Sequence, residues 1–170
     1  MRGGSTAALL MTLALAGPAQ AQSPDPAEPA ARAAYLRRTE SLSWMLAGWS
    51  AASIASGAAM WGLSDSEFVR NVGIQNVAWG AIDAVLATIG LVTAATAEPA
   101  ESAQEWRDQR ELLSTVYWVN FGLDFAYIGS GGAMWAFSDD EQIEGIGAGF
   151  VFQGAFLLGY DFVGALVMRP

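Results

Sequence analysis

Four long stretches of the chain are almost free of charge, and they set its pattern of hydrophobic and polar positions. Residues 41–64 carry no charged side chain, whereas 71–97, 112–138 and 145–168 carry one aspartate each. Each stretch is more than twenty residues long. A helix of that length can cross a hydrocarbon core of about 30 Å. Because backbone polar groups in lipid must be bonded within their own segment, the pattern predicts four transmembrane helices.

Two other architectures compete with this prediction. An eight-stranded outer-membrane barrel would show alternating segments of about ten residues with polar turns between them. Only the glycine- and aromatic-rich stretch 145–168 raises that alternative, because the other three lack polar turns at the needed spacing. A secreted soluble helical protein would need a hydrated face on each helix, and these stretches leave little room for one. We therefore expect an all-α fold.

The first half of the chain is repeated in the second. Half of the residues in 44–67 are identical to those 74 positions later, including the phrases SGAAMWGLSDSE and SGGAMWAFSDDE. Further along, a slip of four residues would bring Gln75 and Asp83 over Gln153 and Asp161. The unit is a two-helix hairpin, and an even number of crossings per unit points both copies the same way. We predict an up-down-up-down four-transmembrane-helix bundle built from two tandem parallel helical-hairpin repeats.

The remaining segments complete the predicted organisation. Residues 1–21 have a basic start, an apolar run and a small-x-small ending, which is typical of a cleaved secretory signal peptide. Residues 22–40 contain three prolines in a largely polar run, which predicts a flexible tether, although its last residues, 35–40, could begin a helix. The first hairpin repeat, a polar loop and the second hairpin repeat follow as 41–97, 98–111 and 112–170.

The repeated phrase predicts how each hairpin is built. Ser64 and Glu67, like Ser138 and Glu141, are spaced as a capping box, in which the serine caps the helix and the glutamate lies three residues on. We therefore expect each serine to begin the second helix of its hairpin. Tryptophans lie near both ends of the first helix of each hairpin and are expected to anchor it at the bilayer interfaces. These anchors are Trp44, Trp61, Trp118 and Trp135.

The residue types that the chain lacks narrow its chemistry. It has no cysteine and no histidine, and all its basic residues are arginine. These absences exclude thiolate nucleophiles, Cys/His zinc sites, a Ser-His-Asp triad and Schiff-base chemistry on lysine. The net charge of −9 argues against a nucleic-acid partner. We therefore expect neither an enzyme nor a bound cofactor.

Three aspartates lie within the apolar stretches and form the core of a candidate intramembrane polar site. Asp83 and Asp124 lie near the middle of their stretches, and Asp161 lies nearer the end of its own. An ionisable group inside a transmembrane helix costs about 3 kcal/mol on insertion scales, which makes it a functional candidate by default. Four amide side chains join the candidate site: Gln75, Asn76, Asn120 and Gln153.

Three roles remain open for these acids. They could hold the bundle in register, line a path for protons or cations, or bind a cation or a partner helix. Carboxylates alone suit Mg²⁺ or Ca²⁺, but no spacing here specifies a metal site. We expect a non-enzymatic accessory, assembly or structural membrane subunit. The alternative is a small transporter or channel for protons, cations or small solutes. The expected partner is the lipid bilayer, with self-association or a second membrane protein left open.

Two indicators of membrane orientation disagree. A cleaved signal peptide places the mature N-terminus, the 98–111 loop and the C-terminus outside the cytoplasm. Most of the arginines lie on that side and Arg70 lies on the other, contrary to the positive-inside rule. Following the signal peptide, we expect the bacterial inner membrane, with both termini periplasmic.

The chain resembles the small uncharacterised four-helix membrane proteins found in many bacteria. The resemblance rests on the amino-terminal segment, the duplicated hairpin and the stretch QNVAWGAID at 75–83. It covers most of the mature chain and implies a four-helix membrane fold. It implies no activity and assigns no functional residue.

Overall fold

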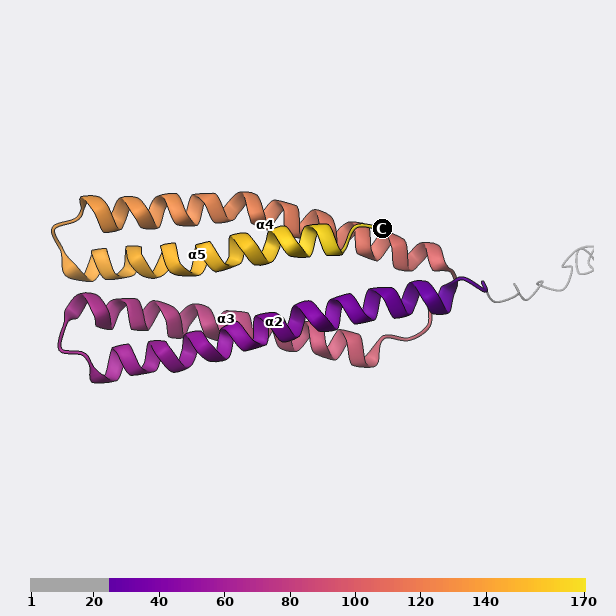
Figure 1. Ribbon diagram of the computed structural model, residues 1–170, viewed down its shortest axis with the longest axis horizontal. Helices are drawn as coiled ribbons and strands as arrows, with labels where there is room; N and C mark the ends of the chain where they lie inside the picture. Colours follow the sequence, from indigo (N-terminus) through magenta and orange to yellow (C-terminus); the bar gives the residue numbers. More distant parts are fainter. Residues whose placement is uncertain (1–24) are drawn as a thin grey trace, which may run out of the picture.

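The structure, a computed structural model, describes residues 25–170 and forms four α-helices there with no strand. They are labelled as in Figure 1: α2 (Glu28–Leu63), α3 (Glu67–Thr96), α4 (Ala103–Phe137) and α5 (Glu141–Val167). The predicted all-α class with four helices is confirmed. The expected signal peptide and the first residues of the expected tether lie outside the described residues.

The helices form two hairpins that lie side by side (Figure 1). Within the hairpins, α2 packs along α3 and α4 packs along α5. Between them, α5 packs against α3 and α2 packs against α4, whereas α3 and α4 do not pack against each other. Both short turns lie at one end of the bundle, and the start of α2, the α3–α4 connection and the C-terminus lie at the other.

The helices α2 and α4 begin earlier than the apolar pattern predicted. Residues 28–40, expected to be a flexible tether, form the first turns of α2, and residues 103–111, expected to be a loop, form the first turns of α4. The tether and loop predictions were wrong for 28–34 and 103–111, because these segments are rich in alanine, glutamate, glutamine and arginine, which favour helix. The helix start considered at 35–40 is confirmed. With 36 and 35 residues, α2 and α4 are about 54 and 52 Å long.

Two acidic side chains bind the beginning of α2 to the beginning of α4. Asp25 Oδ1 accepts a hydrogen bond from the Ala27 amide at 2.9 Å, and its Oδ2 accepts one from the Ala103 amide at 2.8 Å. Glu28 Oε1 accepts a hydrogen bond from Trp106 Nε1 at 2.7 Å. Neither helix has a side-chain cap at its own N-cap residue. The Asp25 carboxylate therefore accepts hydrogen bonds from backbone amides at both helix starts.

The capping residues differ from those expected. The N-cap of α3 is Ser66, whose hydroxyl accepts from the backbone of the first turn, and the N-cap of α5 is Asp140. Ser64 and Ser138 instead end α2 and α4, and their hydroxyls accept hydrogen bonds from the amides of Ser66 and Asp140. The predicted capping boxes were therefore wrong by two residues. The expected glutamates are the first residues of their helices: Glu67 and Glu141.

Facing glycines bring the two helices of each hairpin into backbone contact. A Cβ atom added at Gly73 would lie 2.6 Å from the Gly57 carbonyl oxygen and 2.7 Å from the Trp61 amide nitrogen. A Cβ at Gly147 would lie 2.5 Å from the Gly131 oxygen in the second hairpin. Real Cβ atoms do not approach backbone so closely, so each pair requires glycine. Small residues that let backbones meet are typical of helix packing in membranes.

The contacts of two further glycines show that the predicted register of the repeat is wrong. A Cβ at Gly80 would meet the Ile54 side chain at 2.8 Å, and one at Gly154 would meet Ile128 at the same distance. Each member of the second contact lies 74 positions after its counterpart in the first. The offset of 74 therefore continues through α3 and α5, and the predicted slip of four residues is wrong. The pairs that the slip predicted are not equivalent: Gln75 with Gln153, and Asp83 with Asp161.

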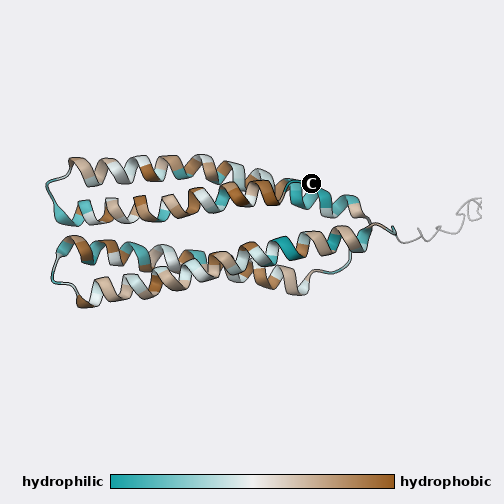
Figure 2. Ribbon diagram, viewed as in Figure 1, coloured by the Kyte–Doolittle hydropathy of each residue, from teal (hydrophilic) through white to brown (hydrophobic). Residues whose placement is uncertain are grey.

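Apolar side chains cover much of the outside of the bundle. Among the described residues, α3 and α5 are long and apolar enough to cross a membrane. Two of the four expected membrane-spanning helices therefore have the required length and hydropathy. Serines, glycines and the polar first turns lower the hydropathy of α2 and α4. Figure 2 shows hydrophilic residues gathered at the turns and at the beginnings of α2 and α4. Only 17% of the most apolar window of α3 and 33% of that of α5 are buried, so most of these side chains are partly or fully exposed.

We predict that Gly73→Ala lowers the stability of the protein, because its methyl group would collide with the backbone of α2. Overpacking of this kind costs about 1–3 kcal/mol. The measurement is thermal unfolding in neutral detergent, followed by circular dichroism. Gly48→Ala is the matched control, since nothing lies within 4 Å of a Cβ at Gly48 and alanine is the better helix former. Equal melting temperatures for the two variants would contradict the proposed contact.

We predict a pH-dependent loss of order where Asp25 joins α2 and α4. The amides of Ala103 and then Ala27 hold the pKa of Asp25 below its usual value. The stabilisation is therefore fully present above about pH 4, the pKa expected for an unfolded aspartate, and is lost as the pH falls through the lowered folded pKa. Hydrogen exchange at pH 7 should be faster in Asp25→Ala than in the wild type at the amides of 103–106. The difference should shrink below about pH 4, whereas a constant difference would exclude a role for the carboxylate charge.

Candidate functional site

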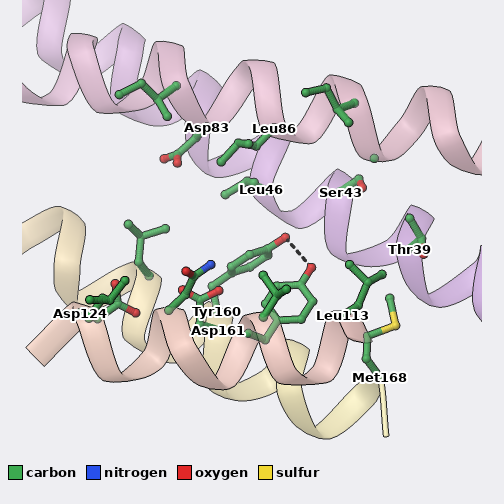
Figure 3. A pocket seen from close by; sticks show the side chains of 18 of the residues that line it. Thr39, Ser43, Leu46, Asp83, Leu86, Leu113, Asp124, Tyr160, Asp161 and Met168 are labelled. Carbon is green, nitrogen blue, oxygen red and sulfur yellow. Dashed lines mark hydrogen bonds between the residues drawn. The ribbon is translucent and has the colours of Figure 1, made fainter. Parts of the chain in front are cut away.

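A cavity of about 380 Å³ lies between the two hairpins, and all four helices contribute to its lining. The three aspartates of the apolar stretches, Asp83 on α3, Asp124 on α4 and Asp161 on α5, all line it. Asn120 lines it as well. Figure 3 shows Asp83 on one side of the cavity, with Asp124 and Asp161 on the opposite side. Tertiary packing therefore gathers into one site the acids that the sequence distributes over three helices.

The cavity has a buried floor and half-exposed rims. Lining residues from α2 and α5, such as Leu46 and Tyr160, are 4% and 9% exposed. Lining residues from α3 and α4, such as Ile82 and Leu123, are both 50% exposed. The half-exposed lining residues of α3 and α4, two helices that do not pack against each other, mark the open side of the cavity. The opening is in the flank of the bundle.

The acids are buried, yet they are incompletely hydrogen-bonded. Asp83 and Asp124 are each 2% exposed, and the Oδ2 atom of each is buried without a hydrogen-bond partner. Asp161 lies beside Asp124 on the same side of the cavity, where the charges of the two carboxyl groups influence each other. Buried polar atoms are normally paired, and an unpaired one points to a missing partner such as a ligand. The cavity therefore presents acceptor atoms that the protein itself does not satisfy.

Aromatic and hydroxyl side chains complete the lining. The Tyr117 and Tyr160 hydroxyls lie 3.4 Å apart, joined by the dashed line in Figure 3, and their rings meet edge to face with centroids 5.7 Å apart. Trp79 and Tyr127 add two further rings to the wall. Thr39 contributes a buried hydroxyl without a partner. The faces of such rings attract cations, particularly when water is excluded.

The acids are not arranged as a metal site. Among residues 25–170, no group of three or more His, Cys, Asp or Glu side chains lies close enough together to hold a metal ion. The cavity also contains no basic side chain among the residues that line it. Its negative groups are spread around a space much larger than an ion.

Three of the predicted amide residues lie elsewhere, at the packed interface between the hairpins. Gln153 is 1% exposed and accepts a hydrogen bond from Trp49 Nε1 at 2.9 Å. Its Nε2 donates to Ser53 Oγ at 3.1 Å and to Asn76 Oδ1 at 3.4 Å. Gln75 packs against Gly149. These amides join α5 to the first hairpin and do not belong to the cavity.

Several lining residues escaped the sequence analysis, although one pattern could have found some of them. Tyr117, Asn120 and Asp124 are spaced by three and four residues, so they share one face of α4. Tyr160 directly precedes Asp161. By contrast, nothing in the sequence distinguishes the lining residues of α2, which are ordinary hydroxyl and apolar side chains.

The four predicted anchor tryptophans all face outward. The exposed fractions of their side chains lie between 38% and 61%. Two other tryptophans point inward: Trp106 is 3% exposed, and the ring of Trp49 stacks on Phe156 with centroids 4.0 Å apart. The outward-facing tryptophans are Trp44, Trp61, Trp118 and Trp135.

The fold and the site define a class of protein: an all-α protein of two packed helical hairpins with an acid-lined cavity between them. The chain belongs to a family of unknown function (DUF6992), whose model matches residues 45–162. The match begins within α2 and includes all three cavity acids. The resemblance to an uncharacterised family is thereby confirmed. No curated protein and no solved structure matches the chain.

We predict that Gln153→Leu weakens the interface between the hairpins and leaves each hairpin intact. The substitution removes the partner of Trp49 Nε1 and two further amide contacts. Interhelical hydrogen bonds of this kind contribute about 0.6–2 kcal/mol each in membranes. The melting temperature in detergent should fall, with a loss of near-ultraviolet signal from Trp49 before any loss of helix. Gln142→Leu, at the exposed start of α5, is the control, and an equal effect there would contradict the prediction.

Proposed function

We propose that the protein is a non-enzymatic integral membrane protein that spans the bilayer four times and carries a small organic cation in its acid-lined cavity. One observation carries the proposal: three buried carboxyl groups from three helices line one cavity, and two of them have an oxygen atom without a partner. This proposal favours the transporter-like alternative of the sequence analysis over an accessory role.

The distribution of apolar side chains supports membrane insertion. Large apolar residues are exposed along all four helices, among them Met45 on α2, Val85 on α3, Val119 on α4 and Phe152 on α5. Soluble monomers rarely expose continuous apolar surface on this scale. The exposed tryptophans of α2 and α4 suit the interfacial regions. The polar first turns of α2 and α4 would then extend beyond the bilayer, because both helices exceed its thickness.

The charge of the cavity supports a cationic ligand. A carboxylate buried without a counter-charge is strongly unfavourable, and the lining supplies no arginine. A cation that enters the cavity would provide that counter-charge and could take the place of a proton on the acids. Exchange of a cation for a proton would couple binding to proton movement. Acids inside transmembrane helices are typical of such pathways.

The size and the walls of the cavity favour an organic cation over a metal ion. A volume of about 380 Å³ suits a small organic molecule. The walls combine apolar side chains with four tyrosines and Trp79, which fit the apolar body of an amine or quaternary ammonium ion. The sideways opening between α3 and α4 would face the lipid, so a ligand with an apolar body could enter from the bilayer.

Membrane insertion is tested first. The full-length protein should remain in the membrane pellet after washing with alkaline carbonate, which releases peripheral proteins. Reporter fusions after Leu63 and Ala100 should then lie on opposite sides of the membrane, with the Ala100 fusion on the periplasmic side. Release of the protein by carbonate would overturn the membrane part of the proposal.

We predict that benzyltrimethylammonium binds the detergent-solubilised protein and that Asp83→Asn or Asp124→Asn weakens this binding by about 10- to 100-fold. Loss of one charged partner costs about 1.5–3 kcal/mol, which corresponds to that range. Isothermal titration calorimetry measures the affinity. Asp139→Asn, in the exposed α4–α5 turn, should bind as the wild type does.

Transport is measured with the same cation in proteoliposomes. Uptake of labelled benzyltrimethylammonium should depend on an opposing proton gradient and should be lost in Asp83→Asn. Equal affinities in the wild type and both aspartate variants would exclude the cavity as the binding site. Binding without any uptake would exclude the carrier function.

A further inference from the structure

Two arginines meet at the end of the bundle that carries the termini, outside the acidic cavity. Arg38 lies on α2 and Arg110 lies on α4, shortly before the apolar stretches that begin at residues 41 and 112. The two helices pack together at this level, since the ring centroids of Tyr35 and Trp106, about one turn earlier, lie 5.1 Å apart, so Arg38 and Arg110 are neighbours across this contact. Burial, and then the neighbouring charge of Arg38, lower the pKa of Arg110. Two like charges have been brought together in a partly buried place.

The same two side chains have donors that the protein does not use. Arg38 Nη1 and Arg110 Nε are buried and have no hydrogen-bond partner. Arg32 differs, because its Nη2 donates to the Ala97 carbonyl at the end of α3, although its own Nε is also unpartnered. A guanidinium donor that is buried without an acceptor is costly, and a nearby like charge adds to that cost. An anion held between Arg38 and Arg110 would remove both penalties.

We infer that Arg38 and Arg110 form a binding site for a phosphate group, supplied by the headgroup of an anionic membrane phospholipid. Planar guanidinium groups bind phosphate oxygens in pairs through parallel N–H donors. The position of the pair supports a lipid source, because both arginines lie where the apolar part of the bundle gives way to its polar end. In the proposed membrane this is the level of the headgroups. The inference rests on the proposed membrane insertion and not on cation binding.

The test compares ligands that share the phosphate and differ in their source. Full-length protein in neutral detergent is melted with phosphatidylglycerol, with phosphate-free diacylglycerol, or with inorganic phosphate. Phosphatidylglycerol should raise the melting temperature by about 3 °C or more, and diacylglycerol should not. An equal rise of the melting temperature with millimolar inorganic phosphate would support the phosphate site but identify its ligand as soluble phosphate and not a lipid headgroup. No rise with either phosphate source would overturn the inference.

Variants distinguish a ligand site from a merely structural pair. Arg38→Gln/Arg110→Gln should lose the rise caused by phosphatidylglycerol, and Arg70→Gln, at the opposite end of the bundle, should keep it. Without added lipid, the double variant should melt at or above the wild-type temperature, because the repulsion is gone. A lower melting temperature without lipid would mean that contacts within the protein hold the two arginines, and it would overturn the inference. Carbonate extraction of the same variants checks that they still enter the membrane, so a failure of insertion is recognised separately.

Discussion

The contact between facing glycine backbones is the constraint on which the rest of this structure depends. Gly57 and Gly73 close the first hairpin, and Gly131 and Gly147 close the second. A backbone contact of this kind fixes both the distance between two helices and their rotation about their own axes. It therefore decides which side chains face the neighbouring hairpin. Apolar attraction alone could not do this, because these helices have apolar residues on nearly every face.

The two hairpins also meet through glycines, because Gly145 and Gly149 of α5 lie against α3, and larger polar side chains join them. Gln153 forms a buried amide cluster with Trp49, Ser53 and Asn76 on one side of the interface. Nearer the terminal end, α3 and α4 stand apart and the acidic cavity lies between the hairpins. The tight part of the interface thus holds the bundle together, and the looser part leaves space for a ligand.

The cavity is asymmetric although the scaffold is duplicated. At the offset of 74 residues, Asp83 corresponds to Leu157 and Asp124 corresponds to Ser50. Asp161 corresponds to Ala87. The repeat therefore accounts for the backbone contacts and for the turns, whereas each acid occurs in one copy only. This separation is expected where a duplicated framework supports a single site at the interface of its two halves.

The apolar stretches determined the number and class of the helices, and the repeated phrase determined their division into two hairpins. The sequence also identified the three aspartates as candidate functional residues, because ionisable side chains are rare within such apolar stretches. Local structure was predicted less well. The starts of α2 and α4 were expected to be tether and loop, although their residue types favour helix, and Asp25 and Glu28 hold them in place by contacts with α4. Ser64 and Ser138 were predicted to be N-caps because their spacing to the following glutamate suits a capping box. The N-caps are instead Ser66 and Asp140, which lie directly before the helices.

Only the tertiary structure decided that three acids share a cavity, that Gln153 and Asn76 belong to a separate cluster, and that Arg38 meets Arg110. The physical reason is that a helix with apolar residues on every face gives no periodic indication of which face is inward. That choice is made by close backbone contacts between glycines on neighbouring helices. The sequence by itself therefore placed the acids at a depth along the helices, and the packing placed them around a common space.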